Sequence, residues 1–427
     1  MTPYSTPTRP ATVDTVLPGG LRLVALHTPD APLAELRLVL PFARTEPALT
    51  PAQRALAACL GTGARTADGR TLTRQAVADR AADLGAELTT VVTAESLVIA
   101  VGVLAAGLPG ALDLLAGLLV RPHYTDHEIG LAHARQPSPG ARPSDRARLR
   151  AALMGRAFGD HPLLAPPPPA GPPPRAAELH ALHQRAVVPA GAVLLITGEA
   201  DPAAVAARAR EALGAWYGGP SGLLSPPFAR AVPTPGRTAV GAADGSGQAL
   251  LLTAGPAEPG NAPLHLAQLV LGGHASSRLA QRLRDRHGLT YAVSATLRET
   301  RAGHWLETEA AGAPGTAARL AEEAVRCLAD LAAHGPTAAE TERARSYALG
   351  FTRFALATRA EEATALAGFL AAGLPLDWLD RYRTTLEEVT HSQVIDAASE
   401  FLDPDRAAIA TLDPGAPARH DKTEPAA

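Results

Sequence analysis

The sequence contains little cysteine, few aromatic residues and no long apolar run. Its two cysteines, Cys59 and Cys327, each lie in an apolar helical pattern, which implies neither a disulfide framework nor an oxidising compartment. No apolar run reaches the roughly 18 residues that a membrane helix needs. The first residues show neither the positively charged start nor the apolar stretch of a signal peptide. We therefore expect a cytoplasmic protein with no membrane partner.

A large excess of either charge is also missing. The formal net charge is −3 and no basic cluster is present, so nucleic acid is not expected as a partner. The apolar content of 46% combined with mixed charge indicates a globular chain. A chain of 427 residues exceeds one ordinary domain, and about two to four domains are expected. Arginine greatly outnumbers lysine, which is typical of a GC-rich bacterial genome.

The apolar pattern predicts an α+β protein. A β-hairpin is expected over 13–27, with a Pro-Gly-Gly turn at 18–20. A helix is predicted to begin at Thr50, followed by proline at its first turn, and an amphipathic helix is predicted over 72–86. Two strands are expected over 87–104. The second half of the chain repeats this plan of strands and helices.

Three pairs of segments, each a little over 200 residues apart, have matching patterns. The pairs are 58–63 with 269–274, 108–120 with 314–331, and 183–202 with 398–415. A duplication at this scale predicts two α+β halves that share an ancestor. We predict a flexible N-terminus (1–12), an N-terminal domain (13–216), a Pro/Gly-rich linker (217–236), a C-terminal domain (237–413) and a disordered tail (414–427). The polyproline stretch 166–174 is interpreted as a stiff surface connection in preference to a recognition motif.

One polar corner, the segment 271–295, contains residue types that proteins use in binding and catalysis. Ala275, Leu279 and Leu283 are predicted to share one helical face, and Gly288 to end the helix in a left-handed conformation. Leu289, Tyr291, Val293 and Ala295 are then expected to alternate on one strand face. Arg284 and Tyr291 would be brought onto one surface, where arginine offers a fork of donors and tyrosine a directed hydroxyl. Taken alone, this corner favours a structural role for both residues.

The same segment resembles the C-terminal-half signature of the insulinase/pitrilysin metallopeptidases, the inverzincins, and the resemblance extends over about 13–413. The matching residues are Gly272, Gly273, Ser276, Ser277, Arg278, Leu279, Leu283, Arg284, Gly288, Leu289 and Tyr291. The resemblance implies two homologous α/β sandwich domains of the LuxS/metallopeptidase type in tandem, forming a cleft. It also implies that Arg284 and Tyr291 act catalytically, by holding the substrate backbone near Gly288 and stabilising the oxyanion.

The N-terminal half lacks the metal motif that this family uses. The resemblance implies His-x-x-Glu-His on the helix after the second strand, in which two His bind zinc and the Glu is the general base. Counting back from Gly61, Thr62 and Arg65 places the two His at Ala52 and Leu56, and the Glu at Ala55. Shifting by one residue gives Gln53, Leu56 and Ala57. Neither register offers a ligand pair, so no metal is expected in this chain.

Other histidines of the sequence do not form a convincing replacement for the missing zinc motif. His180 and His183 are three residues apart on a predicted helix and are interpreted as surface residues. His123, His127 and His133 are expected to be solvated, and Glu128 in the region of the third zinc ligand has no partner. Gly272 and Gly273 form a turn and not part of a dinucleotide fingerprint, because no strand precedes them in a βαβ context.

The resemblance leads to a specific hypothesis about function. The chain would be the non-zinc subunit of a heterodimeric metallopeptidase, inactive alone, with zinc held by a homologous partner. Its substrate would be a peptide, bound as an added strand, and a bacterial leader peptide is one candidate. The alternatives are a structural core subunit that has lost the chemistry, and a peptide-binding scaffold or homodimer without hydrolytic activity.

Overall fold

The computed structural model describes most of the chain. The described residues are 11–29, 31–43, 45, 47–66, 68–135, 143–166, 171–218, 229–242 and 245–414. The predicted tail except Pro414, most of the predicted N-terminal segment, and parts of the polyproline stretch and of the linker therefore lie outside them.

The described residues form two compact units, and each unit combines segments from both halves of the sequence. Unit 1 comprises the described parts of 1–140, 167–226 and 355–376. Unit 2 comprises the described parts of 141–166, 227–354 and 377–427. One segment from each half of the sequence thus belongs to the unit built mainly by the other half.

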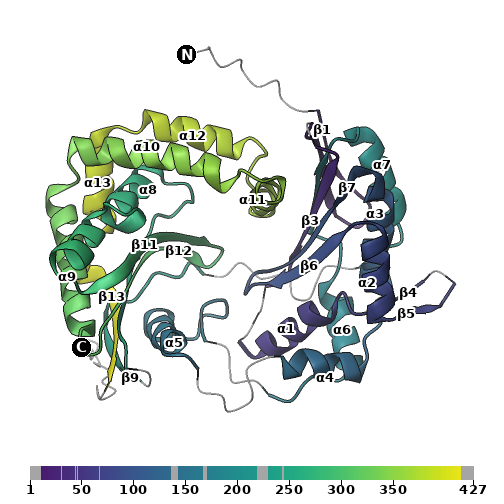
Figure 1. Ribbon diagram of the computed structural model, residues 1–427, viewed down its shortest axis with the longest axis horizontal. Helices are drawn as coiled ribbons and strands as arrows, with labels where there is room; N and C mark the ends of the chain where they lie inside the picture. Colours follow the sequence, from purple (N-terminus) through teal and green to yellow (C-terminus); the bar gives the residue numbers. More distant parts are fainter. Residues whose placement is uncertain are drawn as a thin grey trace. The chain divides into compact units, whose positions relative to one another are not determined.

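Unit 1 is built on a six-stranded sheet with the order β1-β2-β8-β3-β7-β6 (Figure 1). Its strands are β1 (Thr12–Val16), β2 (Arg22–His27), β3 (Leu33–Pro41), β6 (Glu87–Val92), β7 (Ser96–Leu104) and β8 (Val193–Gly198). β1 and β2 form the predicted hairpin, and β6 and β7 are the two strands predicted over 87–104. β2 and β8 are parallel, whereas the other neighbours are antiparallel.

The apolar residues of this sheet alternate between two cores because successive side chains of a strand point to opposite faces. On one face, Leu23, Leu36 and Leu38 pack with α1, α3, α6 and α7. These helices are α1 (Thr50–Cys59), α3 (Leu108–Val120), α6 (Ala176–Ala186) and α7 (Pro202–Leu213); α2 (Arg74–Asp83), α4 (Asp126–Ala134) and the small pair β4 (Ala64–Arg65) and β5 (Thr71–Leu72) complete this side. The opposite face packs against α11 (Arg359–Ala371).

Unit 2 is built on a five-stranded sheet with the order β11-β12-β10-β13-β9 (Figure 1). Its strands are β9 (Gly236–Ala242), β10 (Gly247–Ala254), β11 (Thr290–Thr300), β12 (Gly303–Gly312) and β13 (Ala408–Pro414). One face packs with α8 (Ala262–Gln268), α9 (Ala317–His334), α10 (Ala338–Ala355) and α13 (His391–Phe401), and α12 (Trp378–Glu388) lies beside α8. The other face packs against α5 (Asp145–Phe158).

The two sheets have the same topology. Without β1, the order β6-β7-β3-β8-β2 of unit 1 corresponds to β11-β12-β10-β13-β9 of unit 2. The parallel pair β2 and β8 corresponds to the parallel pair β13 and β9. The predicted repeat is therefore present in the fold: two homologous α+β domains in tandem, with α3 corresponding to α9 and the β8 region to the β13 region.

Candidate functional site

Arg284 lies in a π-helical segment, Ala280–Arg286, which has a wider turn than an α-helix and is often found at functional sites. Its Nε donates to Asp285 Oδ1 at 2.8 Å, and its Nη2 donates to the backbone oxygen of Ala275 at 2.8 Å. Hydrogen bonding to the Asp285 carboxylate raises the pKa of Arg284, and Tyr291 lies near enough to add a smaller electrostatic contribution. The guanidinium is therefore charged, anchored on one side and partly exposed, with 37% of its side chain accessible.

Gly288 turns the chain from this helical segment into β11. Its φ of +58° is in the left-handed region that favours glycine. The N–H of Gly288 donates to Arg284 O at 3.1 Å, and the N–H of Leu289 donates to Leu283 O at 2.8 Å. The predicted helix end at Gly288 is confirmed, and these two bonds fix the start of β11 relative to Arg284.

Tyr291 occupies a β-bulge that the sequence did not reveal. The β11–β12 register shifts between Thr290 and Ala292, which leaves Tyr291 as the extra residue. The Thr290 hydroxyl donates to Ala292 O at 2.7 Å and stabilises the bulge. As a result Leu289 is buried while Tyr291 is 93% exposed, so the predicted alternation from Leu289 to Ala295 is wrong at Tyr291. Val293, Ala295 and Leu297 pack in the same core as Leu289, so Tyr291 is the side chain of this series that departs from it.

The helical face before Arg284 is also different from the prediction. Leu279 and Leu283 are fully buried, as expected, but Ala275 is exposed. Ala275 precedes the helix, because the Ser277 hydroxyl accepts from the N–H of Ala280 and marks its start. The exposed Ala275 carbonyl is instead the acceptor that holds Arg284.

Gly272 allows the preceding helical turn to approach β11 closely. A Cβ atom at Gly272 would lie 2.8 Å from both the Cβ and the backbone nitrogen of Ala295. Beside it, the buried Gln268 amide donates to Ala295 O at 2.6 Å. This contact explains why the signature requires a small residue here, and it holds the middle of β11 against the end of α8.

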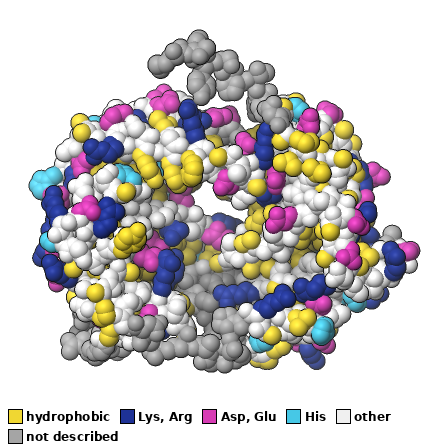
Figure 2. Space-filling model, viewed as in Figure 1, with side chains coloured by type: hydrophobic (Ala, Val, Ile, Leu, Met, Phe, Trp, Pro, Cys, Tyr) yellow, Lys and Arg dark blue, Asp and Glu magenta, His cyan; other side chains and the backbone are white. Residues whose placement is uncertain are grey.

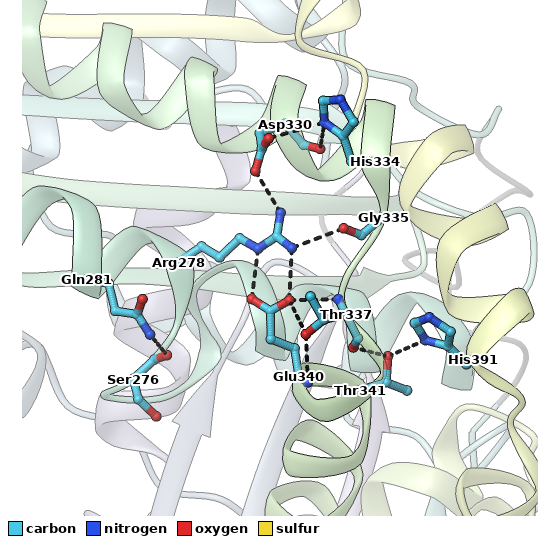
Figure 3. A network of polar contacts seen from close by, with 10 residues as sticks. All are labelled: Ser276, Arg278, Gln281, Asp330, His334, Gly335, Thr337, Glu340, Thr341 and His391. Atoms are coloured by element: carbon cyan, nitrogen blue, oxygen red, sulfur yellow. Dashed lines mark hydrogen bonds and ion pairs between the residues drawn. The ribbon is translucent and has the colours of Figure 1, made fainter.

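Arg278 links the same helical segment to α9 and α10 (Figure 3). Its guanidinium makes two parallel bonds of 2.9 Å to the Glu340 carboxylate and further bonds to Asp330 at 2.8 Å and to Gly335 O at 3.0 Å. The bidentate bond to Arg278, with the Thr337 donors, lowers the pKa of Glu340 to about 2. Arg278 therefore positions the segment that carries Arg284.

The predicted metal-ligand positions on α1 form part of an apolar core. Leu56 is fully buried and Ala55 nearly so, while Ala52 packs at the edge of the same cluster. Gln53 is buried and donates to Phe42 O at 2.7 Å, so its side chain is already committed to the backbone. Within the part of the chain that the structure describes, no three His, Cys, Asp or Glu side chains are placed to hold a metal ion. The side chains at these α1 positions do not fit zinc.

The end of the polyproline stretch lies beside this helix. Residues 171–174 line a small cavity together with Pro51 and Ala55 of α1 and with Ile129 and His133 of α4. The cavity beside Ala55 is thus lined mainly by proline and apolar side chains. The carboxylate of Glu128, in the region expected for the third zinc ligand, forms an ion pair with Arg74 at 2.5 Å.

His183 is not a surface residue, so that interpretation is wrong. Only 4% of His183 is exposed, and its Nε2 lies 2.9 Å from Leu119 O while Nδ1 lies 2.8 Å from the Tyr124 hydroxyl. Burial lowers its pKa to about 4. Nε2 therefore carries the proton and donates to Leu119, and the Tyr124 hydroxyl donates to Nδ1. His180 and His123 are half-buried nearby. The periodicity placed His183 on α6, but its burial depends on α3 and Tyr124, which sequence spacing does not show.

The two cysteines are free and buried, in agreement with the sequence pattern. Burial raises the pKa of both thiols to about 11, which makes them poor nucleophiles at neutral pH. Over the described ranges, none of the helices is both long and apolar enough to cross a membrane.

Sequence comparisons find a matching family model and a similar protein. Residues 175–347, which include the Arg284–Tyr291 corner, match the family model described as "Peptidase M16 inactive domain". A protein named "uncharacterized zinc protease" from Mycobacterium leprae is 28% identical over 355 residues, covering 78% of this chain and 76% of that protein.

Solved structures show the same fold. The peptidase M16 inactive domain from Pseudomonas fluorescens superposes with a TM-score of 0.81 at 21% identity, covering 95% of this chain and 98% of that one. A protease from Helicobacter pylori gives a TM-score of 0.82 at 16% identity, covering 95% of this chain and 100% of that one. The solved structures share the fold of this chain, and the family model and the Mycobacterium leprae protein make the chain similar to the peptidase M16 family, the insulinase/pitrilysin-like group that its sequence resembles.

Proposed function

We propose that this chain is the non-zinc subunit of a heterodimeric M16 metallopeptidase. It supplies Arg284 and Tyr291 to a site whose zinc and general base belong to a homologous subunit carrying His-x-x-Glu-His. The observation that carries the proposal is the contrast between an exposed Arg/Tyr corner in unit 2 and an apolar α1 in unit 1.

The Arg284–Tyr291 corner has the properties that peptide binding needs. The Arg284 guanidinium stays charged, and among the described residues its Nη1 has no hydrogen-bond partner. Tyr291 projects into solvent from the bulge. Two donors on one surface can hold a substrate carbonyl and stabilise the negative charge that develops on its oxygen.

The position of β11 supports binding of an extended peptide. β11 is the edge strand of the unit 2 sheet and pairs with β12 on one side. An edge strand presents backbone donors and acceptors to which a peptide can add as a further strand. The bulge at Tyr291 places its hydroxyl beside the start of that edge, so the donors lie where the peptide backbone would pass.

The metal side of the reaction is assigned to the partner because α1 has no ligands to offer. Ala52, Ala55 and Leu56 have neither a donor atom for zinc nor a base for water. We also propose that the heterodimer acts in the cytoplasm and that its substrate is a peptide, for which a leader peptide of a bacterial natural product is one candidate.

Co-expression with a zinc-motif homologue tests the proposal. The purified chain alone should contain no stoichiometric zinc and cleave no peptide, whereas the pair should be active. Arg284→Ala and Tyr291→Phe should each reduce kcat of the pair by roughly 100-fold, the effect of losing one donor to an oxyanion. Metal analysis and steady-state kinetics on the same preparations provide the readouts.

Arg286→Ala is a matched control, since Arg286 is an exposed arginine in the same helical segment. It should leave kcat within about twofold, as expected for a surface substitution. Pairs that remain fully active with Arg284→Ala and Tyr291→Phe would favour the structural-subunit alternative. Zinc bound by the isolated chain would contradict the assignment of the metal to the partner.

A further inference from the structure

The exposed aromatic residues of unit 2 are concentrated in one place. Of its five exposed large hydrophobic side chains among the described residues, four are aromatic: Tyr291, Tyr347, Phe351 and Phe354. In unit 1, Tyr217 is the aromatic one among six. Aromatic residues make up only 4% of the chain, so this gathering calls for a physical explanation.

Tyr347, Phe351 and Phe354 form a continuous row on α10, which we call the aromatic row. Their spacing of four and three residues places them on one face of the helix. The Tyr347 and Phe351 rings are stacked with centroids 5.5 Å apart, and Phe351 and Phe354 are 6.2 Å apart. Figure 2 shows hydrophobic side chains gathered over the ribbon of α10 drawn in Figure 1.

The aromatic row is continuous with the Arg284 corner. The His274 ring lies 5.5 Å from the Tyr347 ring, and His274 is held in place by the N–H of Ser276. The next residue, Ala275, provides the carbonyl that Arg284 binds. Arg284 is thus connected to the row through the Ala275 carbonyl, the adjoining residue His274 and the Tyr347 ring, within one unit.

The spacing and charge of the row fit an extended peptide. Side chains on one face of an extended chain repeat every two residues, about 6.6 Å, close to the 5.5–6.2 Å ring spacing of the row. Aromatic faces pack well against aliphatic and aromatic side chains. Arg343 is exposed four residues before Tyr347 and lies close enough to His274 to lower its pKa further, so this end of the row is positively charged.

We infer that the aromatic row binds the peptide substrate outside the catalytic corner, and that it selects extended peptides with apolar side chains at alternate positions and an acidic residue beside them. This inference rests on the proposed function, because it identifies the substrate class of the same site. The row acts in binding and takes no part in bond cleavage.

A binding assay on the full-length chain alone tests the inference. Two fluorescein-labelled twelve-residue peptides of equal composition would be compared by anisotropy. One has Leu and Phe at positions i, i+2 and i+4 next to a Glu, and the other has them at i, i+3 and i+7. We expect the first to bind more tightly, and the double variant Tyr347→Ser/Phe351→Ser to weaken its binding roughly tenfold, as expected for the loss of aromatic packing.

Tyr217→Ser is the control, because Tyr217 is an exposed aromatic residue of unit 1 that is not part of the row. Equal affinity of the double variant and the unaltered chain would overturn the inference. So would sedimentation data in which the unaltered chain is a dimer and the double variant a monomer, since the row would then be a self-association surface.

Kinetics with the zinc-bearing partner separate this inference from the proposed function. The double variant should raise KM and leave kcat unchanged, whereas Arg284→Ala should lower kcat. Binding that depends on the row without any hydrolysis by the pair would contradict the proposed function alone. Hydrolysis that requires Arg284 but is indifferent to the row would contradict this inference alone.

Discussion

Two equivalent helix-to-strand corners of this protein differ in almost everything but their turn. In unit 1, Gly85 has a φ of +60° and precedes β6, and in unit 2, Gly288 has a φ of +58° and precedes β11. Both strands are edge strands of equivalent sheets. The left-handed glycine is thus a shared requirement of the fold and says nothing by itself about function.

The side chains around the two glycines show the difference. Ala81 lies four residues before Gly85, and Leu88 lies three residues after it. Both are half-buried and pack against the core. The same offsets from Gly288 give Arg284 and Tyr291. The fold therefore tolerates an apolar corner, so the polar pair of unit 2 is not a structural necessity.

The backbone also differs between the two corners. The β6–β7 register is continuous, whereas β11 carries the bulge that turns Tyr291 outward. α2 is a regular α-helix, whereas Arg284 lies in a π-helical segment. Both irregularities lie at the proposed site, and the described residues of the unit 1 corner show neither.

The largest expected effect comes from making the unit 2 corner resemble the unit 1 corner. Arg284→Ala combined with Tyr291→Leu should reduce kcat/KM of the heterodimer by roughly 100- to 1,000-fold. The melting temperature should change little because both side chains are exposed. Steady-state kinetics and thermal unfolding measure the two effects. An active double variant would mean that the two corners are functionally equivalent.

Gly61 and Gly272, which correspond in the sequence repeat, should respond differently to alanine. Gly272→Ala places a methyl group 2.8 Å from Ala295 and should lower the free energy of unfolding by about 1–3 kcal/mol. At Gly61 the nearest atom, of Leu88, lies at an ordinary 3.5 Å, so Gly61→Ala should cost less than about 0.5 kcal/mol. Urea unfolding of both variants tests this; equal losses would show that the close approach to β11 is not special to unit 2.

The two turn glycines should have equal structural costs but unequal functional ones. A Cβ at Gly288 meets open space and one at Gly85 only Leu104 at 4.0 Å, so each Gly→Ala variant should lose about 1–2 kcal/mol of unfolding free energy from the left-handed backbone alone. Peptidase activity of the heterodimer should fall for Gly288→Ala only. Loss of activity in Gly85→Ala at matched stability would place part of the site in unit 1.

The smallest expected effect is a change in how the stability of the chain depends on pH when Arg278 is replaced. The pKa of Glu340 is about 2 in the folded protein and 4.5 ordinarily. The ionised carboxylate therefore stabilises the fold above pH 4.5, and this stabilisation is lost as the pH falls toward 2. Arg278→Met should reduce that acid-side dependence, because only the Thr337 donors then lower the pKa of Glu340, with a loss of about 0.2–1 kcal/mol at neutral pH for this partly exposed group. Unfolding measured between pH 2 and 7 tests it, and Arg319→Met, at an exposed arginine of α9, is the control. If the Arg278→Met variant loses stability at low pH as the unaltered chain does, the Arg278–Glu340 ion pair is not the cause of the pH dependence.

Much of the fold could be predicted from periodicity and turn residues, because these report on local backbone preference. The hairpin at Thr12–His27, the start of α1 at Thr50, the turn at Gly288 and the internal repeat all agree with such patterns. The polar corner could be recognised because its spaced residues match a family signature. Local patterns sufficed wherever neighbouring residues alone decide the conformation.

Other features depend on residues far apart in the sequence. Arg37 of β3 is buried because it bonds Thr364 and Ala360 O of α11, and Glu307 of β12 is buried against Arg150 of α5. No periodicity indicates that α11 belongs to unit 1 and α5 to unit 2. The burial of His183 by Tyr124 escaped prediction for the same reason.

The sequence by itself determined the two-fold repeat, the left-handed glycine turn, the resemblance to a family and the lack of metal-ligand side chains at the expected positions of α1. The tertiary structure alone decided that Tyr291 faces solvent, because a bulge depends on the partner strand β12. It also decided that Arg284 is anchored by the carbonyl of Ala275 and that the aromatic row continues from that corner. The sequence states which side chain stands at each position, whereas contacts between distant segments decide the direction in which that side chain points.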